Sequence, residues 1–339
     1  MPREMDSRFH GNDKDALFPL TNTYESATKS TPIPIICGPT ASGKTALAVE
    51  LAGRYPIEIV SADSRQIIKR LDIGTSKPSP EERERVRFHL IDLIEPGERY
   101  TAFRFIEDAG KAIESILQRG HVPVVVGGTG LYLRALTEGV VEIEQDDLGI
   151  RHRLEEEMEQ LGPEQMYERL SKIDPPEAAR LHPNNKVRVI RALEIFYLTG
   201  KPKSELTATG AYRKSQHNYR YYCLLPERQV LYRTIEARVE QMMESGLLDE
   251  IRRLIQDGLQ EQIRKANVIG YTELLDHLDG KATLSETISL IKQNTRRYAK
   301  RQITWFRHQT GSDFFQDTAS LAESLKPRLQ DWGKRSEKT

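Results

Sequence analysis

The sequence predicts an α/β fold: a P-loop parallel sheet core flanked by helices and interrupted by a helical insertion domain. Short apolar runs alternate with helical patterns in the first part of the chain, at residues 33–37, 57–60, 88–91 and 122–126. The glycine-rich sequence GPTASGKT directly follows the first run. A stretch with helical patterns only, 146–216, then precedes one more apolar run at 219–225. Strands that alternate with helices are typical of a parallel sheet covered on both faces.

The spacing of apolar residues places the helices. The segment TALAVELAGRY continues from the glycine-rich loop with a helical pattern. A second helix is expected up to Gly120, with five apolar residues on one side: Phe103, Ile106, Ala109, Ile113 and Leu117. Helical patterns return from Gln229 and include TISLIKQNTRRYAKRQITWFRHQ near the C-terminus.

These changes along the chain predict the domain boundaries. Residues 1–32 are polar and lack periodicity, so we expect a disordered N-terminal tail. The catalytic core with its C-terminal helices takes 33–145 and 217–318, and the helical insertion takes 146–216. Residues 319–339 are expected to form a second disordered polar tail.

Composition and charge exclude several classes of protein. The 50 Lys and Arg residues balance the 50 Asp and Glu residues, so any RNA contact must come from local basic patches. No apolar run approaches the roughly 20 residues that span a membrane, and the N-terminus lacks the apolar core of a signal peptide. Cys37 and Cys223 lie in separate apolar runs, which predicts buried small side chains and fits the cytoplasm.

The most specific motif is the loop after the first strand, which matches the pattern GxxxxGK[ST] in full. Its residues are Gly38, Pro39, Thr40, Ala41, Ser42, Gly43, Lys44 and Thr45. Backbone N–H groups, the N-terminus of the following helix and the Lys44 charge together suit a polyphosphate. The hydroxyl of Thr45 is a candidate Mg²⁺ ligand.

Two further polar sites follow predicted strands. Asp63 comes after the second strand, where it is a candidate metal ligand or general base, or else a helix N-cap. The sequence GGTG at 127–130 follows the fourth strand, where Thr129 could donate to a phosphate oxygen or belong only to a tight turn. Because ligands bind beyond the carboxyl ends of parallel strands, we expect the loop, Asp63 and Thr129 to line one pocket.

Basic and aromatic residues are interleaved near the C-terminus. The stretch 295–308 contains Arg296, Arg297, Tyr298, Lys300, Arg301, Trp305, Phe306 and Arg307. This mixture suits phosphate contact and base stacking, but an amphipathic helix with a solvated basic face gives the same pattern. Arg238, considered alone, is typical of a surface arginine.

The motifs GPTASGKT, DSRQ with DIGTSKP, GGTGLY, IRALE, GY and KRQITWFR, in this order, resemble those of the tRNA dimethylallyltransferases, also called tRNA isopentenyltransferases. The resemblance implies transfer of a dimethylallyl group to N6 of the adenosine next to the anticodon, in tRNAs that read codons beginning with U. It implies tRNA and dimethylallyl diphosphate as partners and Mg²⁺ as cofactor. We expect a cytoplasmic monomer that does not associate with membranes.

The resemblance also assigns roles to individual residues. The loop 38–45 would hold the diphosphate together with Thr129 and Arg238, and Asp63 would be the general base. The residues implied to contact tRNA are Asp63, Ser64, Arg65, Gln66, Arg151, Val187, Arg188, Val189, Ile190, Arg191, Gly270 and Tyr271.

Three other functions remain open. A free-nucleotide isopentenyltransferase would share the loop, the base and GGT, but the insertion and KRQITWFR favour tRNA. A P-loop kinase is disfavoured because no aspartate follows VPVVVGG. A nucleotide-gated RNA-binding module is disfavoured by Asp63 at a strand end.

Overall fold

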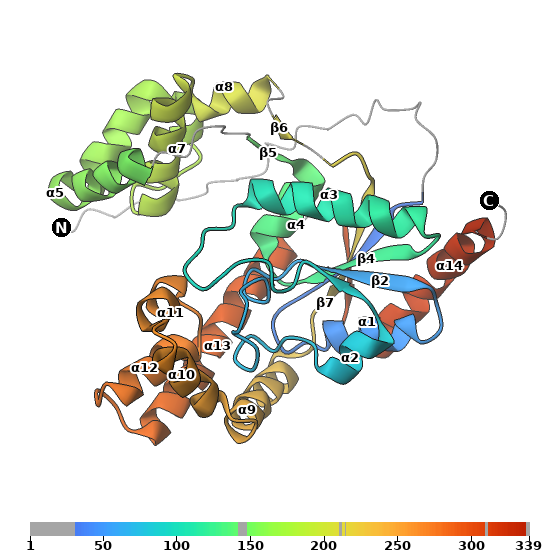
Figure 1. Ribbon diagram of the computed structural model, residues 1–339. Coiled ribbons are helices and arrows are strands. Elements are labelled where there is room, and N and C mark those ends of the chain that lie inside the picture. The colour runs from blue at the N-terminus through green and yellow to red at the C-terminus, as the bar shows by residue number, and fades with distance from the viewer. Residues whose placement is uncertain (1–30, 142–147, 210–211, 214, 309–310, 337–339) are drawn as a thin grey trace, which may run out of the picture. The chain divides into compact units, whose positions relative to one another are not determined.

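The computed structural model describes residues 31–141, 148–209, 212–213, 215–308 and 311–336 (Figure 1). Most of the predicted N-terminal tail, 1–32, and the first residues of the predicted insertion lie outside the described residues. Residues from Thr31 onward form one compact unit. Within the described part of the chain, none of the helices has the length and apolarity needed to cross a membrane.

The predicted parallel sheet is confirmed. Its order is β3-β2-β4-β1-β7-β8, and every neighbouring pair is parallel. The strands are β1 (Ile33–Cys37), β2 (Ile57–Ser61), β3 (Phe88–His89), β4 (Val122–Gly127), β7 (Tyr219–Leu224) and β8 (Ser312–Phe315). The edge strand β8 was not predicted, because its short sequence SDFF carries little apolar signal and depends on pairing with β7.

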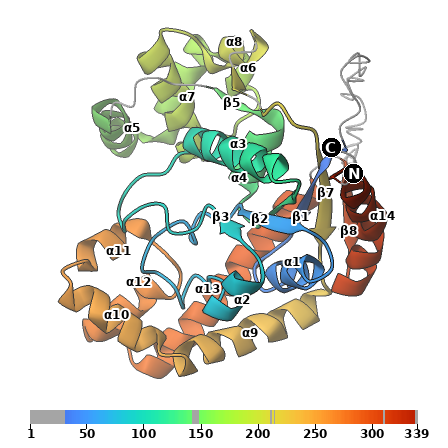
Figure 2. The same cartoon turned by 45° about the vertical axis from the view of Figure 1, so that its right-hand side comes forward.

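Helices cover both faces of this sheet, as expected from the pattern. Along β1, Ile35 and Cys37 face one apolar cluster, while Ile36 faces the other. The first cluster includes α3 (Ala102–Gln118) and α4 (Gly130–Glu138), and the second includes α1 (Lys44–Ala52). Figure 2 shows α3 and α4 on one side of the strands and α1 on the other. Both cysteines are buried, as predicted.

The C-terminal segment differs from the expected disordered tail. Residues Thr318–Ser336 form the helix α14, which packs against α1, β7 and β8. Leu321, Leu325 and Leu329 recur every four residues and are all buried in the second cluster. The composition of this stretch is polar overall, and for that reason a disordered tail was predicted. Its few apolar residues nevertheless lie on one side of the helix, and such a narrow stripe is enough to pack a helix against the core.

The helices of the insertion pack on one another around their own apolar cluster. They are α5 (Leu148–Ile173), α6 (Pro175–Ala178), α7 (Lys186–Thr199) and α8 (Lys203–Ala208). The chain enters through β5 (Val140–Val141) and leaves through β6 (Tyr212–Arg213), which pair antiparallel. The expectation of helices alone over 146–216 therefore missed β6, whose two residues are too few to show a strand pattern. Gly162, with φ of 83°, breaks α5.

The remaining helices follow β7, as predicted from Gln229 onward. They are α9 (Arg228–Glu244), α10 (Leu247–Gln256), α11 (Gln260–Ala266), α12 (Tyr271–Leu278) and α13 (Leu284–Arg307). Apolar residues of α9 to α13 join the same cluster as α3 and α4, so these helices belong to the core that supports the sheet.

Candidate active site

The phosphate-binding loop connects β1 to α1 at the carboxyl edge of the sheet. Gly38 and Gly43 have φ of 146° and 93°, values that side chains with a Cβ rarely adopt. A Cβ at Gly38 would lie 2.3 Å from the carbonyl oxygen of Leu224 on β7. The close approach of β7 therefore requires glycine at the first position of the motif.

Lys44 lies inside this loop rather than in solvent. Its Nζ donates to the carbonyl oxygen of Pro39 at 2.5 Å and to Oγ of Ser42 at 3.2 Å. Burial lowers the pKa of the Lys44 ammonium to about 8; the Asp63 carboxylate opposes this change and the Arg238 guanidinium adds to it. The loop thus holds a cation that an incoming anion would stabilise.

Arg238 reaches the same loop from α9. Its guanidinium donates to Oγ1 of Thr40 at 3.4 Å. Burial lowers the pKa of Arg238, and the Asp63 carboxylate opposes that effect. The interpretation of Arg238 as an isolated surface arginine is therefore wrong, because the fold brings it to residues nearly two hundred positions away in sequence.

Asp63 and Thr129 lie together beyond the ends of β2 and β4. Oδ1 of Asp63 accepts a hydrogen bond from the backbone N–H of Arg65 at 2.8 Å. Oγ1 of Thr129 accepts one from the backbone N–H of Ser64 at 2.9 Å. Residues 64–67 form turns, so Asp63 does not cap a helix. Thr129 holds the DSRQ turn in place and is itself partly exposed.

The glycines of GGTG allow other segments to approach closely. A Cβ at Gly127 would lie 2.2 Å from the carbonyl oxygen of Ala62. At Gly128 it would lie 2.5 Å from Nε2 of Gln302, and at Gly130 2.5 Å from the Trp305 ring. Two of these three glycines therefore admit side chains of α13 next to the site.

Two further residues of α13 belong to this region: Gln302, which sequence reasoning missed, and Tyr298, which it named only as part of the basic and aromatic stretch 295–308. Gln302 is buried and bridges the phosphate-binding loop and the GGTG turn. Burial and the charge of Asp63 raise the pKa of Tyr298 to about 12. The clue for Gln302 was a polar residue one turn before Phe306, on the side of the helix that faces the core.

The residues of DSRQ differ in their accessibility to RNA. Arg65 is exposed, and its guanidinium donates to the carbonyl oxygen of Ala266 at 2.8 Å. Gln66 is buried, accepting from Ser61 Oγ at 3.1 Å and donating to the carbonyl oxygen of Ser76 at 2.9 Å. Gln66 therefore supports the turn rather than presenting its amide to solvent.

The candidate tRNA residues of the insertion also divide into two groups. Val187 and Arg188 are exposed at the start of α7. Val189 and Ile190 are buried in the cluster of the insertion, so their side chains are not available to RNA. The side chains of α7 alternate in this way because only one side of the helix faces α5.

Arg151 and Arg191 meet at a buried carboxylate. Arg191 donates to Oε2 of Glu194 at 2.8 Å, and Arg151 lies 3.7 Å from the same oxygen. Glu194 is fully buried. The two arginines therefore balance an internal charge in addition to any contact with RNA.

Tyr271, expected to contact tRNA, is a core residue whose side chain is not exposed to solvent. It is fully buried, and its hydroxyl donates to Glu250 and accepts from the backbone N–H of Gly74 at 3.2 Å. Gly270 has φ of 96° and begins α12. The Gly-Tyr pair therefore secures the DIGTSKP loop against α10 and α12.

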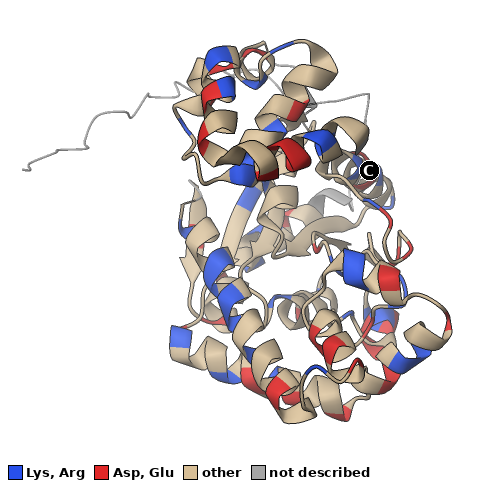
Figure 3. Ribbon diagram, turned by 90° about the vertical axis from the view of Figure 1, so that its left-hand side faces the viewer, with Lys and Arg blue, Asp and Glu red and all other residues tan. Residues whose placement is uncertain are grey.

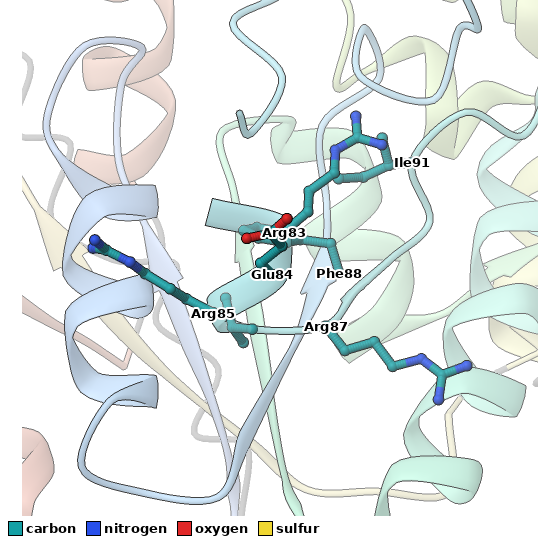
Figure 4. Close-up of a pocket in the computed structure, with 7 residues that line it drawn as sticks. Arg83, Glu84, Arg85, Arg87, Phe88 and Ile91 are labelled. Atoms are coloured by element: carbon teal, nitrogen blue, oxygen red, sulfur yellow. The ribbon is translucent and has the colours of Figure 1, made fainter. Parts of the chain in front are cut away.

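A cavity of about 390 Å³ beside α2 (Pro80–Arg85) has no evident part in this site. Its lining residues are Arg83, Glu84, Arg85, Val86, Arg87, Phe88 and Ile91. The labelled arginine side chains point in different directions and do not converge on a common anion (Figure 4). The lining includes none of the phosphate-loop, DSRQ or GGTG residues.

Known proteins are similar to this chain over most of its length. The family model described as IPP transferase matches residues 66–309, and the model described as isopentenyl transferase matches residues 31–94. The tRNA dimethylallyltransferase of Geobacter metallireducens is 48% identical over 282 residues, which cover 83% of this chain and 91% of the relative. The tRNA dimethylallyltransferase of Thermotoga maritima is 42% identical over 298 residues, which cover 87% of this chain and 96% of the relative.

Solved structures share the fold over most of the chain. The full-length tRNA isopentenylpyrophosphate transferase from Bacillus halodurans has a TM-score of 0.64 and 39% identity, covering 91% of this chain and 100% of that one. A eukaryotic dimethylallyltransferase acting on tRNA has a TM-score of 0.72 and 31% identity. The match covers 89% of this chain and 77% of that one. Because these matches span most of both partners, the chain belongs to the IPP transferase family of tRNA dimethylallyltransferases.

Proposed function

We propose that this protein transfers the dimethylallyl group of dimethylallyl diphosphate to N6 of the adenosine next to the anticodon, in tRNAs that read codons beginning with U. Its relatives carry the name tRNA dimethylallyltransferase. One observation carries the proposal for the site: Lys44 and Arg238 both donate hydrogen bonds to the phosphate-binding loop, and Asp63 lies at the neighbouring strand end in the turn that Thr129 holds. Two cations and a carboxylate together suit a reaction that expels an anion and removes a proton.

The cations would stabilise the leaving group. As the bond between the allylic carbon and the diphosphate oxygen breaks, negative charge accumulates on the diphosphate. Lys44, Arg238, Thr129 and the N–H groups of residues 38–45 are the candidates to bind it. Mg²⁺, which usually takes few protein ligands together with phosphate oxygens, would neutralise further charge when bound at the hydroxyl of Thr45. Thr45 is partly exposed in the first turn of α1, as such a ligand must be.

Asp63 would act as the general base. The N6 amine of adenine is a weak nucleophile because its lone pair is delocalised into the ring. While the new bond between N6 and the allylic carbon forms, one N6 proton must leave, and Asp63 would accept it before releasing it to solvent. Its partial exposure and its fixed orientation in the turn of residues 63–65 support this role.

RNA would bind through local basic surfaces. Arg297, Lys300 and Arg301 are exposed on α13, and Arg188 is exposed on α7. We propose that residues 146–216 form an insertion that contacts tRNA beside the core formed by 33–145 and 217–318. The adenine must leave its stack to reach Asp63, as in other enzymes that modify bases. We further propose that the protein acts as a monomer in the cytoplasm.

One assay separates this function from its rivals. Protein and Mg²⁺ are incubated with dimethylallyl diphosphate labelled in the allyl group and, in parallel, with total tRNA, AMP, ADP or ATP. We expect label in tRNA at an adenosine next to the anticodon, and diphosphate in equal amount. Label in a free nucleotide instead would support a nucleotide isopentenyltransferase. ATP hydrolysis stimulated by tRNA, without prenyl transfer, would support a kinase or another NTPase.

A further inference from the structure

Gln302 on α13 joins two segments of the site with a single buried amide. Its Oε1 accepts from the backbone N–H of Thr40 at 2.8 Å. Its Nε2 donates to the carbonyl oxygen of Gly128, also at 2.8 Å. The side chain is buried, and Gly128 has no room for a Cβ because Nε2 occupies that space. Both ends of the amide are therefore used, in an environment where an unmade hydrogen bond is costly.

The hydrogen bond to Thr40 fixes more than one atom. A trans peptide is planar, so the N–H of Thr40 and the carbonyl of Pro39 point in opposite directions. With the N–H turned toward Gln302, the carbonyl oxygen of Pro39 faces the interior of the loop, where Nζ of Lys44 donates to it at 2.5 Å. The position of Lys44 thus depends on the orientation of the peptide that Gln302 holds.

The helix that carries Gln302 is firmly attached to the core. Ala299 and Phe306, one turn away on either side, are fully buried. Arg296 pairs with Glu236 of α9 at 2.6 Å, and Lys292 pairs with Glu240. Since α9 also carries Arg238, which donates to Thr40, two helices meet at the same loop residue.

We propose that Gln302 is a positioning residue for the diphosphate site, which keeps the peptide between Pro39 and Thr40 in the orientation that places Lys44 inside the loop. Without it, this peptide is free to rotate and to turn a carbonyl toward the anion. The identity of the natural ligand, dimethylallyl diphosphate, rests on the proposed function. The role of Gln302 in binding diphosphate does not depend on it.

The test compares Gln302→Met with Gln293→Met, since Gln293 is an exposed glutamine of the same helix. Binding of inorganic diphosphate is measured by calorimetry at fixed pH and Mg²⁺, without tRNA. We expect roughly tenfold weaker binding for Gln302→Met, the size expected for the loss of the buried hydrogen bond to Thr40, and unchanged binding for Gln293→Met. In the transfer assay the KM for dimethylallyl diphosphate should rise to the same extent, while the KM for tRNA stays within about twofold.

A purely structural role would lower the melting temperature and the active fraction, and hence kcat, without changing the KM for dimethylallyl diphosphate. Gln302→Asn keeps the amide but is too short to reach both partners, so we expect intermediate diphosphate affinity. If Gln302→Met does not fold, Gln302→Asn replaces it in the comparison with Gln293→Met. Equal diphosphate affinity of folded Gln302 variants and the parent would overturn the assignment. A parent that binds diphosphate but does not modify tRNA would overturn the proposed function alone.

Discussion

Asp63 owes its orientation to its immediate neighbours in the chain. Its Oδ1 accepts from the backbone N–H of Arg65, two residues along. A short side chain that bonds to its own backbone in this way forms a turn and has little rotational freedom. The carboxylate is therefore directed before any substrate arrives, which is what a general base requires.

We predict that Asp63→Asn lowers the rate of transfer by about 10²–10⁴, because an amide cannot accept the N6 proton. The asparagine oxygen can still accept from Arg65, so the turn should remain and the KM for dimethylallyl diphosphate should change little. Single-turnover rates measure the effect. Asp331→Asn, at an exposed position of α14, is the control. Near-parental rates for Asp63→Asn would contradict the role of base.

Lys44 predicts a pH dependence of substrate binding. Burial lowers its pKa to about 8, so the ammonium loses its proton as the pH rises through that value. Only the charged form attracts a diphosphate, so the affinity for dimethylallyl diphosphate should fall above pH 8, by up to about tenfold per pH unit. Binding titrations from pH 7 to pH 10 measure it. Lys44→Met should bind weakly with no such decline; a decline of equal size in that variant would assign the titration to another group.

At the level of single elements, the two sides of α7 differ in their surroundings. Val189 and Ile190 face the apolar cluster of the insertion, while Val187 and Arg188 face solvent. Arg191 lies between them and pairs with the buried Glu194. Removal of Arg191 would leave a buried carboxylate with less compensation, so its effect on RNA binding would be mixed with a loss of stability.

Arg188 is consequently the better test of the RNA surface. We predict that Arg188→Ala weakens tRNA binding and reduces the slope of log affinity against log salt by about 1, because one phosphate contact is lost. The KM for dimethylallyl diphosphate should not change. Arg54→Ala, which removes an exposed cation just after α1, serves as control. If the slope of log affinity against log salt is unchanged in Arg188→Ala, the proposal that α7 contacts tRNA phosphates is wrong.

The start of α12 has a structural purpose. The Tyr271 hydroxyl accepts from the backbone of Gly74 and donates to Glu250, whose other oxygen accepts from the backbone N–H of Ile73 at 3.0 Å. We predict that Tyr271→Phe lowers the free energy of unfolding by about 1–3 kcal/mol, since buried polar groups lose a partner. Urea denaturation measures this, with Tyr55→Phe as control.

The salt dependence of tRNA binding should stay the same in Tyr271→Phe, because a buried hydroxyl makes no phosphate contact. If Tyr271→Phe has the stability of the parent but binds tRNA more weakly and with a different salt dependence, Tyr271 contacts tRNA after all.

At the scale of the whole molecule, the core is completed by the last helix. The leucines of α14 fill the second apolar cluster, and Thr318 at its start lies next to Gly43 of the phosphate-binding loop. We predict that Leu325→Ala destabilises the fold by about 2–5 kcal/mol, the usual cost of a buried leucine. Ser324→Ala, one residue away and exposed, should have little effect on thermal melting. Equal melting temperatures for the two variants would show that α14 does not belong to the folding unit.

Charge is also arranged at the scale of the molecule. The chain has no net charge, and acidic and basic residues are interspersed over most of the described helices (Figure 3). We therefore expect affinity for tRNA to depend on a few exposed arginines and lysines rather than on a diffuse positive field.

The sequence by itself determined those parts of this protein that depend on local order. The parallel strands, the loop 38–45 and the positions of Asp63 and Thr129 after strand ends follow from patterns a few residues long, because strands and turns are set by neighbouring residues. The resemblance of the motifs led to the family for the same reason. The apolar stripe of α14 was also present in the sequence, but its burial could not be recognised without β7 and β8.

The tertiary structure alone decided which distant residues meet. Arg238 and Gln302 reach Thr40 from α9 and α13, and Tyr271 turns inward to Gly74. No local pattern distinguishes a charged or polar residue on an amphipathic helix that faces solvent from one that faces a partner far along the chain. That choice depends on how whole helices pack against the sheet, and packing is settled by the burial of all the elements together.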